Sequence, residues 1–322
     1  MIGKYFLKRD KSILFGGAVL ILCVLLLTNC KKRRAFNEED GQAALDLTEF
    51  RNENEAVISD ANLSISDQFL VRGKGTEIEG ASSATMCGMS MDTSQVFKGI
   101  ITLYYNGVIC NNRKKEGIVV LTIQNYPLKK WKQKGCVLKV EYLAFKSTNT
   151  VTGKSVQLDG IELVTNESGG TWYDLKYLNQ SSLVHSITAN DLKVRYGKDA
   201  VAIYSVGRRY TYTYSGNVMT CVMEGTGNAS DKSNLDCWGQ TRDGFAITSQ
   251  VKTPLVWKSS CAPGKFVTGE INVTVDGKYY DLNCVFGSDA DGNYESGNVC
   301  VYGWRLNWTY KRKNNHRVFG YN

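Results

Sequence analysis

The chain has 322 residues, of which 43% are hydrophobic and 22% are charged, and it contains ten cysteines, three prolines and two histidines. This is the composition of a folded globular protein with one large domain or two smaller ones. The net charge is +8, but residues 1–29 hold four basic residues and one acidic residue, and Lys31–Arg34 hold four more positive charges, so the remaining chain is near +1. A body this close to neutral lacks the charge expected of a nucleic-acid-binding protein.

The first predicted element is an export signal over residues 1–29. Basic residues precede an apolar run from Ile13 to Leu27, which is short for a membrane span of about 20 residues. The run ends in Leu27-Thr28-Asn29-Cys30, the order of a bacterial lipoprotein signal in which Cys30 becomes the lipid-carrying first residue. The alternative is an uncleaved signal anchor, which Lys31–Arg34 favour because basic residues that follow an apolar segment tend to remain cytoplasmic.

Membrane attachment is therefore predicted at the N-terminal end. Lipidated Cys30 would supply the anchor, and Lys31–Arg34 would contact anionic head groups. We expect a cell-envelope protein in the outer membrane, or a signal-anchored membrane protein under the alternative interpretation.

Residues 30–80 are predicted to form a tether that contains an amphipathic helix. This stretch is polar and acidic, and glycines at 73, 75 and 80 end it. Apolar residues recur with helical spacing on one face: Leu47, Phe50, Val57, Ile58, Ala61, Ile65 and Phe69. We expect one helix, or two, outside the folded body.

Residues 81–322 are predicted to form an antiparallel β domain. Tyr210, Tyr212 and Tyr214 alternate with threonines, and Asp276-Gly277 joins two alternating segments as a tight hairpin turn would. No long helical pattern separates the strand patterns, so the fold class is all-β: a β-sandwich or open barrel, or two stacked sandwiches. Gly160 is expected at a bulge where the inward-facing residues change from Val156 and Leu158 to Ile161 and Leu163.

The cysteines of the mature chain predict disulfide bonds. Eight remain after the signal, an even number that fits an oxidising compartment. We expect the pairs Cys87–Cys110, Cys221–Cys237 and Cys261–Cys300 from their proximity in sequence and the strand patterns beside them. No Cys-x-x-Cys sequence supports zinc-ribbon or thioredoxin chemistry.

Metal and cofactor chemistry have little support. Met86, Met89 and Met91 surround a cysteine, and thioether sulfurs suit Cu(I), but methionines beside a disulfide cysteine more often fill a core edge. We therefore predict no metal and no cofactor. Asp289–Asn293 lacks the glycine and glutamate positions of a calcium loop and is expected to form a turn.

Catalytic residues are equally hard to find. His185 lies between apolar residues and is expected to be a hydrogen-bonded core or edge histidine, and His316 lies in a basic tail. No nucleophile-elbow sequence is present. Paired carboxylates remain available for a hydrolase, although their separation is not encoded in the sequence. Trp131, Trp172, Trp238 and Trp257 lie near predicted turns, where they could stack on sugars or pack in the core.

The chain resembles the uncharacterised lipoproteins that are abundant in Bacteroidota. The resemblance rests on Leu27-Thr28-Asn29-Cys30, on the acidic helical stretch after it, on residues 86–93 (Met-Cys-Gly-Met-Ser-Met-Asp-Thr), and on residues 101–107 (Ile-Thr-Leu-Tyr-Tyr-Asn-Gly) followed by Cys110. It implies an envelope lipoprotein with a β-rich body and no particular activity.

Three hypotheses about function follow. The first is a non-catalytic, lipid-anchored protein that binds a glycan, a protein or another envelope component. The second is a carboxylate-driven hydrolase on a β-sandwich, which requires two facing carboxylates in a cleft. The third is a lipid or lipoprotein carrier, which requires a dry apolar cavity in a half-closed sheet.

Overall fold

The computed structural model describes residues 38–71, 88–198, 200–229, 231–261, 264–278, 281–295, 300–310 and 313–321. The predicted signal, Cys30 and Lys31–Arg34 lie outside these residues, as do Met86 and Cys87. All described residues belong to one compact unit, which spans Glu38–Asn322.

The described residues of this unit form one long helix, a short helix, a 3-10 turn and fifteen strands. The helical elements are α2 (Glu38–Val71), η1 (Val96–Lys98) and α3 (Trp172–Tyr177). The strands are β1 (Met89–Asp92), β2 (Ile100–Cys110), β3 (Arg113–Ile123), β4 (Cys136–Asn149), β5 (Ser155–Asn166), β6 (Leu183–Tyr196), β7 (Ala200–Ser215), β8 (Val218–Gly225), β9 (Gly227–Ala229), β10 (Lys232–Gln240), β11 (Ala246–Lys258), β12 (Thr268–Val275), β13 (Asp281–Ser288), β14 (Gly303–Tyr310) and β15 (Lys313–Gly320). The all-β prediction is confirmed.

The strands form one antiparallel sheet instead of two stacked sandwiches. Its order follows the chain from β1 to β7 and from β10 to β15, since each strand pairs with the next through a hairpin or short connection. The exception lies at the centre, where β8 pairs with the C-terminal parts of β7 and β11 and β10 pairs with their N-terminal parts. β8 and β10 thus lie end to end between the same two strands, and these four strands form a closed circuit of pairings.

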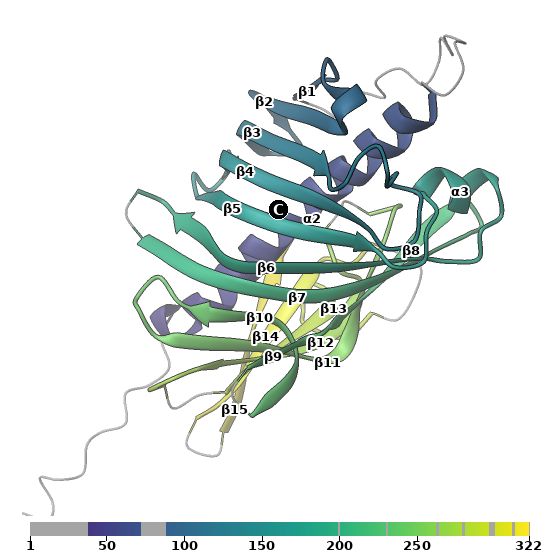
Figure 1. Ribbon diagram of the computed structural model, residues 1–322. Coiled ribbons are helices and arrows are strands. Elements are labelled where there is room, and N and C mark those ends of the chain that lie inside the picture. Colours follow the sequence, from purple (N-terminus) through teal and green to yellow (C-terminus); the bar gives the residue numbers. More distant parts are fainter. Residues whose placement is uncertain are drawn as a thin grey trace, which may run out of the picture. The chain divides into compact units, whose positions relative to one another are not determined.

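Helix α2 occupies the concave face of the curved sheet. Figure 1 shows it crossing the strands between β2–β7 and β12–β15. Every predicted apolar position whose side chain is described is at most 2% exposed, namely Leu47, Phe50, Val57, Ile58, Ala61 and Ile65. The residues that the sheet turns toward α2 are equally buried, including Leu103, Val119, Val140, Tyr204 and Ile271.

The prediction of a tether over residues 30–80 is therefore wrong for the described part of that range. The predicted helix exists, and it is one unbroken helix of 34 residues. It lies in the same compact unit as the strands, so no boundary separates it from the β domain. Among the described helices, none is long and apolar enough to cross a bilayer.

The irregularity predicted at Gly160 is present. The register of β5 shifts against both neighbouring strands beside this residue, whose φ is +132°. The predicted change of face does not occur: Glu162 and Val164 continue the inward side, whereas Ile161 is 42% exposed.

Candidate functional site

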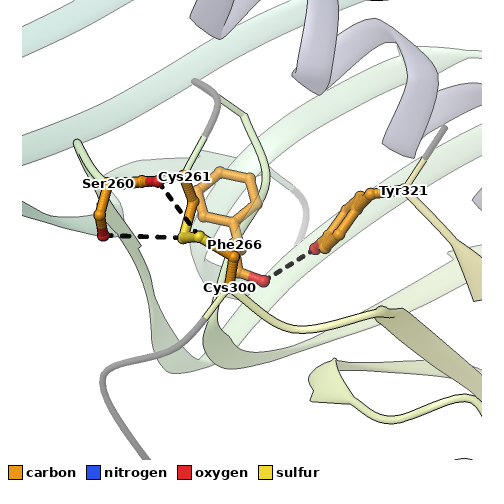
Figure 2. The surroundings of a disulfide bond; sticks show 5 residues. All are labelled: Ser260, Cys261, Phe266, Cys300 and Tyr321. Atoms are coloured by element: carbon orange, nitrogen blue, oxygen red, sulfur yellow. Dashed lines mark hydrogen bonds between the residues drawn. A yellow bond between two sulfur atoms is a disulfide. The ribbon is translucent and has the colours of Figure 1, made fainter.

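The cysteine residues divide into bonded and free groups. Cys261 and Cys300 form the predicted disulfide bond and tie the segment after β11 to the segment before β14. Figure 2 shows Ser260 beside this bond, with its hydroxyl 3.9 Å from Cys261 Sγ. It also shows the Tyr321 hydroxyl, which donates to the backbone carbonyl of Phe266 at 2.9 Å. Cys110 is also disulfide-bonded, while its predicted partner Cys87 lies outside the described residues.

The predicted Cys221–Cys237 bond is wrong, because both thiols are free and buried. Cys221 lies opposite Tyr212, and Cys237 lies opposite Val206 on the same strand. Six strand residues separate these positions, which corresponds to about 20 Å. A disulfide bond needs Cα atoms within about 7 Å. Cys136 and Cys284 are likewise free and buried.

The methionine cluster is only partly described. Met89 and Met91 lie on edge strand β1 and are half-buried, and Met86 falls outside the described residues. No group of three or more histidine, cysteine or acidic residues suited to a metal ion occurs in the described parts of the chain.

His185 is a core residue, but the hydrogen bond that we expected for its ring is absent. It is fully buried on β6, and neither ring nitrogen has a partner. The ring instead packs between Trp131 and Tyr212, with centroids 5.1 and 5.5 Å away. Burial lowers the pKa of His185 to about 3, so the ring is neutral at ordinary pH.

Three of the four tryptophans predicted near turns are in the core. Trp131, Trp172 and Trp257 are 2%, 8% and 4% exposed, which leaves them unable to stack on an external sugar. Trp238 is half-buried against glycines 207 and 227.

A charged cluster joins α2 to the inner face of the sheet. Arg51 donates from Nε and Nη2 to Asp236 Oδ2 at 2.9 and 2.7 Å. The hydroxyl of Ser249 donates to the other carboxylate oxygen at 2.6 Å. Burial disfavours the Asp236 carboxylate, but Arg51 and Arg208 together hold its pKa below the ordinary value.

Two further carboxyl groups lie in this cluster. Arg208 Nη1 contacts Glu55 Oε1 at 3.3 Å, and the Tyr210 hydroxyl donates to the same oxygen. Glu162 accepts from Asn54 and from the Tyr142 hydroxyl, both at 2.8 Å. Burial raises the pKa of Glu55 to about 7 and also raises that of Glu162.

This cluster is enclosed. All its side chains, on α2 and on the five strands β4, β5, β7, β10 and β11, are at most 4% exposed. Substrate therefore has no access to Glu55 and Glu162, the carboxyl groups of this cluster whose pKa values are raised. The cluster positions the helix, because burying these groups is tolerated only where each finds a partner.

A groove of about 930 Å³ runs over the part of α2 that the sheet leaves uncovered. Its floor is the half-buried stripe of the helix formed by Leu45, Glu49, Asn52, Ala56 and Asp60. Two cations of its wall are paired with the helix: Arg113 with Glu53 at 3.1 Å, and Lys115 with Asp60 at 3.3 Å. Because of these ion pairs, the groove is part of the packing interface between α2 and the sheet.

The second concavity, of about 550 Å³, lies on β12–β15. Its central row consists of Asn272, Asn283, Asn307 and His316, which lie directly opposite one another on the four strands. Their strand neighbours Leu282 and Leu306 are buried, so alternation directs the row to the outer face.

The three amides of this row form a ladder. Asn307 donates to Asn283 Oδ1 at 2.9 Å, and Asn283 donates to Asn272 Oδ1 at 2.8 Å. Asn283 also donates to Glu270 Oε1 at 2.7 Å, so both of its N–H groups are used. Since an amide carries two N–H donors and an oxygen with two lone pairs, the capacity left for a ligand lies in the N–H groups of Asn272, the second N–H of Asn307 and the remaining oxygen lone pairs. Asp281 and Arg305 lie in the adjoining rows.

A turn closes one side of this concavity. Residues 289–293 form the expected turn, in which Asp289 accepts from the Asn293 backbone at 2.8 Å. Arg305 Nη1 donates to the Gly292 carbonyl at 2.8 Å, which fixes the turn beside the row. We name the surface formed by Asn272, Asn283, Asn307, His316 and their flanking residues the asparagine face.

The asparagine face is the arrangement that sequence patterns missed. Asparagine is depleted in strands, yet this face has one at corresponding positions of three successive strands. The signal was visible as Asn272, Asn283 and Asn307 inside strand patterns, but only the register brings them into one row.

Comparisons with known proteins gave no match: no family model, no curated protein and no solved structure is significantly similar to this chain.

Proposed function

We propose that the protein is a non-catalytic binding protein of the cell envelope, held by lipidated Cys30 and by Lys31–Arg34, and that it binds a glycan on the asparagine face. The observation that carries the proposal is the ladder of Asn272, Asn283 and Asn307 within an accessible concavity. A row of amides, with Asp281, Arg305 and His316 beside it, offers closely spaced donors and acceptors. This chemistry matches the adjacent hydroxyl groups of a sugar.

Folding alone gives little reason for such a row. An outward strand position stabilises a sheet best with threonine, tyrosine or a β-branched residue. The volume of about 550 Å³ also falls in the range of small-ligand sites.

The other two hypotheses have less support. A hydrolase needs carboxyl groups that reach its substrate, and Glu55 and Glu162 lie enclosed between α2 and the sheet. A lipid carrier needs an apolar cavity inside the sheet, and α2 fills the concave face.

A glycan array of neutral, amino and acidic oligosaccharides tests the proposal with the full-length protein. We expect binding of at least one oligosaccharide, and a loss of about thirtyfold in affinity for N283A/N307A, which removes on the order of 2 kcal/mol of hydrogen bonding. The matched control is Asn190→Ala, an exposed strand asparagine on β6.

Two results would reject the proposal. One is the absence of any bound oligosaccharide for the folded protein. The other is a bound oligosaccharide whose affinity is the same for the wild type, N283A/N307A and Asn190→Ala.

A further inference from the structure

Three segments at one end of the strands expose lysines together with large apolar side chains. They are η1, the connection of residues 124–135 between β3 and β4, and α3 with its flanking residues 167–180. Figure 1 shows the β3–β4 connection and α3 at the same end of the sheet, on the right. We call this surface the basic end.

The segments are in direct contact with one another. Gly99, which follows η1, is packed so closely on Tyr126 that an added Cβ would lie 2.7 Å from the tyrosine Cβ. The Gly170 N–H donates to the Lys132 carbonyl at 2.8 Å, and the Asn166 amide donates to the Trp131 carbonyl at 2.8 Å. The basic end is therefore one continuous surface.

Aromatic side chains beneath the surface hold it in place. Trp131 packs on His185, which packs on Tyr212, which packs on Trp172, with centroid distances of 5.1, 5.5 and 5.6 Å. The two tryptophans at the ends of this row of rings are buried, while Lys130, Lys132 and Tyr173 beside them in sequence are exposed. His185 is part of this support.

The apolar residues of the basic end are among the most exposed in the described residues. Leu128 is 87% exposed and Phe97 is 67% exposed. Leu178, Tyr177 and Tyr173 are 62%, 57% and 45% exposed. A folded protein gains nothing from large apolar groups in water, and a continuous group of them marks an interaction surface.

The charge of the basic end is strongly one-sided. Six exposed lysines lie on the three segments: Lys98, Lys129, Lys130, Lys132, Lys134 and Lys176. The two acidic residues of these segments have partners: Asp174 accepts from Thr171, and Glu167 pairs with Arg209 at 3.1 Å. Because residues 35–322 have a net charge near +1, these lysines are a local excess.

We propose that the basic end is a docking surface for an anionic phospholipid bilayer. Lysines attract the anionic head groups, while Leu128, Phe97 and the α3 side chains enter the boundary of the acyl chains, the combination found in peripheral membrane proteins. The proposal is independent of the asparagine face and of the anchor at Cys30. A lipid bilayer is the expected partner because the surface combines positive charge with exposed apolar side chains.

The test uses the full-length chain in nanodiscs of pure phosphatidylcholine, which accommodate its N-terminal segment whether or not it is lipidated. These nanodiscs are mixed with vesicles of phosphatidylcholine alone or with 30% phosphatidylglycerol, and co-flotation is measured in about 0.1 M salt. We expect flotation only with the anionic vesicles, because each lysine at an anionic surface adds about a fivefold gain in partitioning.

Two variants separate charge from insertion. Replacing Lys129, Lys130, Lys132 and Lys134 by glutamine is expected to weaken partitioning onto the vesicles by about 600-fold, which is fivefold for each lysine. Replacing Leu128 and Tyr177 by serine is expected to weaken it at least tenfold while retaining the salt dependence. The matched control replaces four exposed lysines elsewhere, Lys154, Lys193, Lys198 and Lys252, by glutamine, and should float like the wild type.

Three outcomes would overturn the proposal. Equal flotation with neutral and anionic vesicles removes the role of charge. Equal losses in the basic-end and control lysine variants show that only total charge matters. Unchanged flotation of the Leu128/Tyr177 variant, together with equally tight binding of soluble polyglutamate, identifies a general polyanion surface instead of a lipid surface.

Discussion

Arg208 and Arg209 are neighbours in sequence with opposite surroundings. Arg208 faces the core, is fully buried, and donates to Asn54 and Glu55 of α2. Arg209 faces outward, is 46% exposed, and pairs with Glu167. The two residues therefore form a matched pair for measuring what the buried cluster contributes to stability.

Replacement of Arg208 by methionine should lower the free energy of unfolding by about 3 kcal/mol, because buried carboxyl groups lose a charged partner. Replacement of Arg209 by methionine should change it by less than about 1 kcal/mol, since exposed ion pairs contribute little. Urea denaturation of both variants and the wild type measures the difference. Equal losses in the two variants would show that the cluster does not position α2 energetically.

Single residues show what sequence patterns can and cannot specify. Gly160 was identifiable because a glycine inside a strand marks a bulge. The inward position of Glu162 was not identifiable, because its partner Asn54 lies 108 residues earlier on a different element. Similarly, Arg51 reaches Asp236 across 185 residues. The spacing of residues within a short segment carries no information about pairs that lie so far apart in the sequence.

At the scale of elements, α2 shows the limit of helical periodicity. The spacing of Leu47, Phe50, Val57 and Ile58 correctly predicted a helix and its buried face. It could not reveal that the sheet also covers most of the remaining helix surface, where Arg51 and other polar side chains are buried. A polar helix face indicates exposure to solvent only when no neighbouring element offers hydrogen-bond or ion-pair partners. Here strands that are distant in sequence offer such partners.

The Cys261–Cys300 bond joins two elements across a sequence separation of 39 residues. In the chain-entropy model, closing a loop of this length stabilises the folded state by about 4 kcal/mol. The double variant C261S/C300S should therefore unfold at a clearly lower urea concentration than the wild type. A stability loss below about 1 kcal/mol would mean that the neighbouring contacts of Phe266 and Tyr321 already hold these segments together.

At the scale of the described unit, the order of the strands could be predicted from the sequence, whereas the curvature of the sheet could not. Hairpin signals such as Asp276-Gly277 act between neighbouring strands, and most of the sheet is built from such neighbours. The wrapping of the sheet around α2, and the end-to-end placement of β8 and β10, depend on register shifts and on packing against the helix. These are properties of the assembled unit.

Two buried groups, Glu55 and His185, change the stability of the whole unit in opposite directions as the pH changes. The pKa of Glu55 is about 7 in the folded protein and 4.5 in an ordinary glutamate, so its contribution to stability is lost as pH rises from about 4.5 to 7. The pKa of His185 is about 3 in the folded protein and 6.5 otherwise, so its contribution is lost as pH falls from about 6.5 to 3. Between about pH 4.5 and 6.5 the two slopes have opposite signs, each about 1.4 kcal/mol per pH unit.

Single variants should separate the two slopes. Relative to the wild type, Glu55→Gln should gain about 3 kcal/mol of unfolding free energy between pH 4.5 and pH 7, because the wild type alone must ionise a buried carboxyl group. Conversely, His185→Phe should gain about 4 kcal/mol relative to the wild type as pH falls from 6.5 to 3. Urea denaturation across this range measures both, and Glu224→Gln, which changes an exposed residue on β8, is the control for replacing a glutamate by glutamine. If the difference between Glu55→Gln and the wild type were constant across the range, Glu55 would titrate normally, and the enclosed cluster would have to admit water.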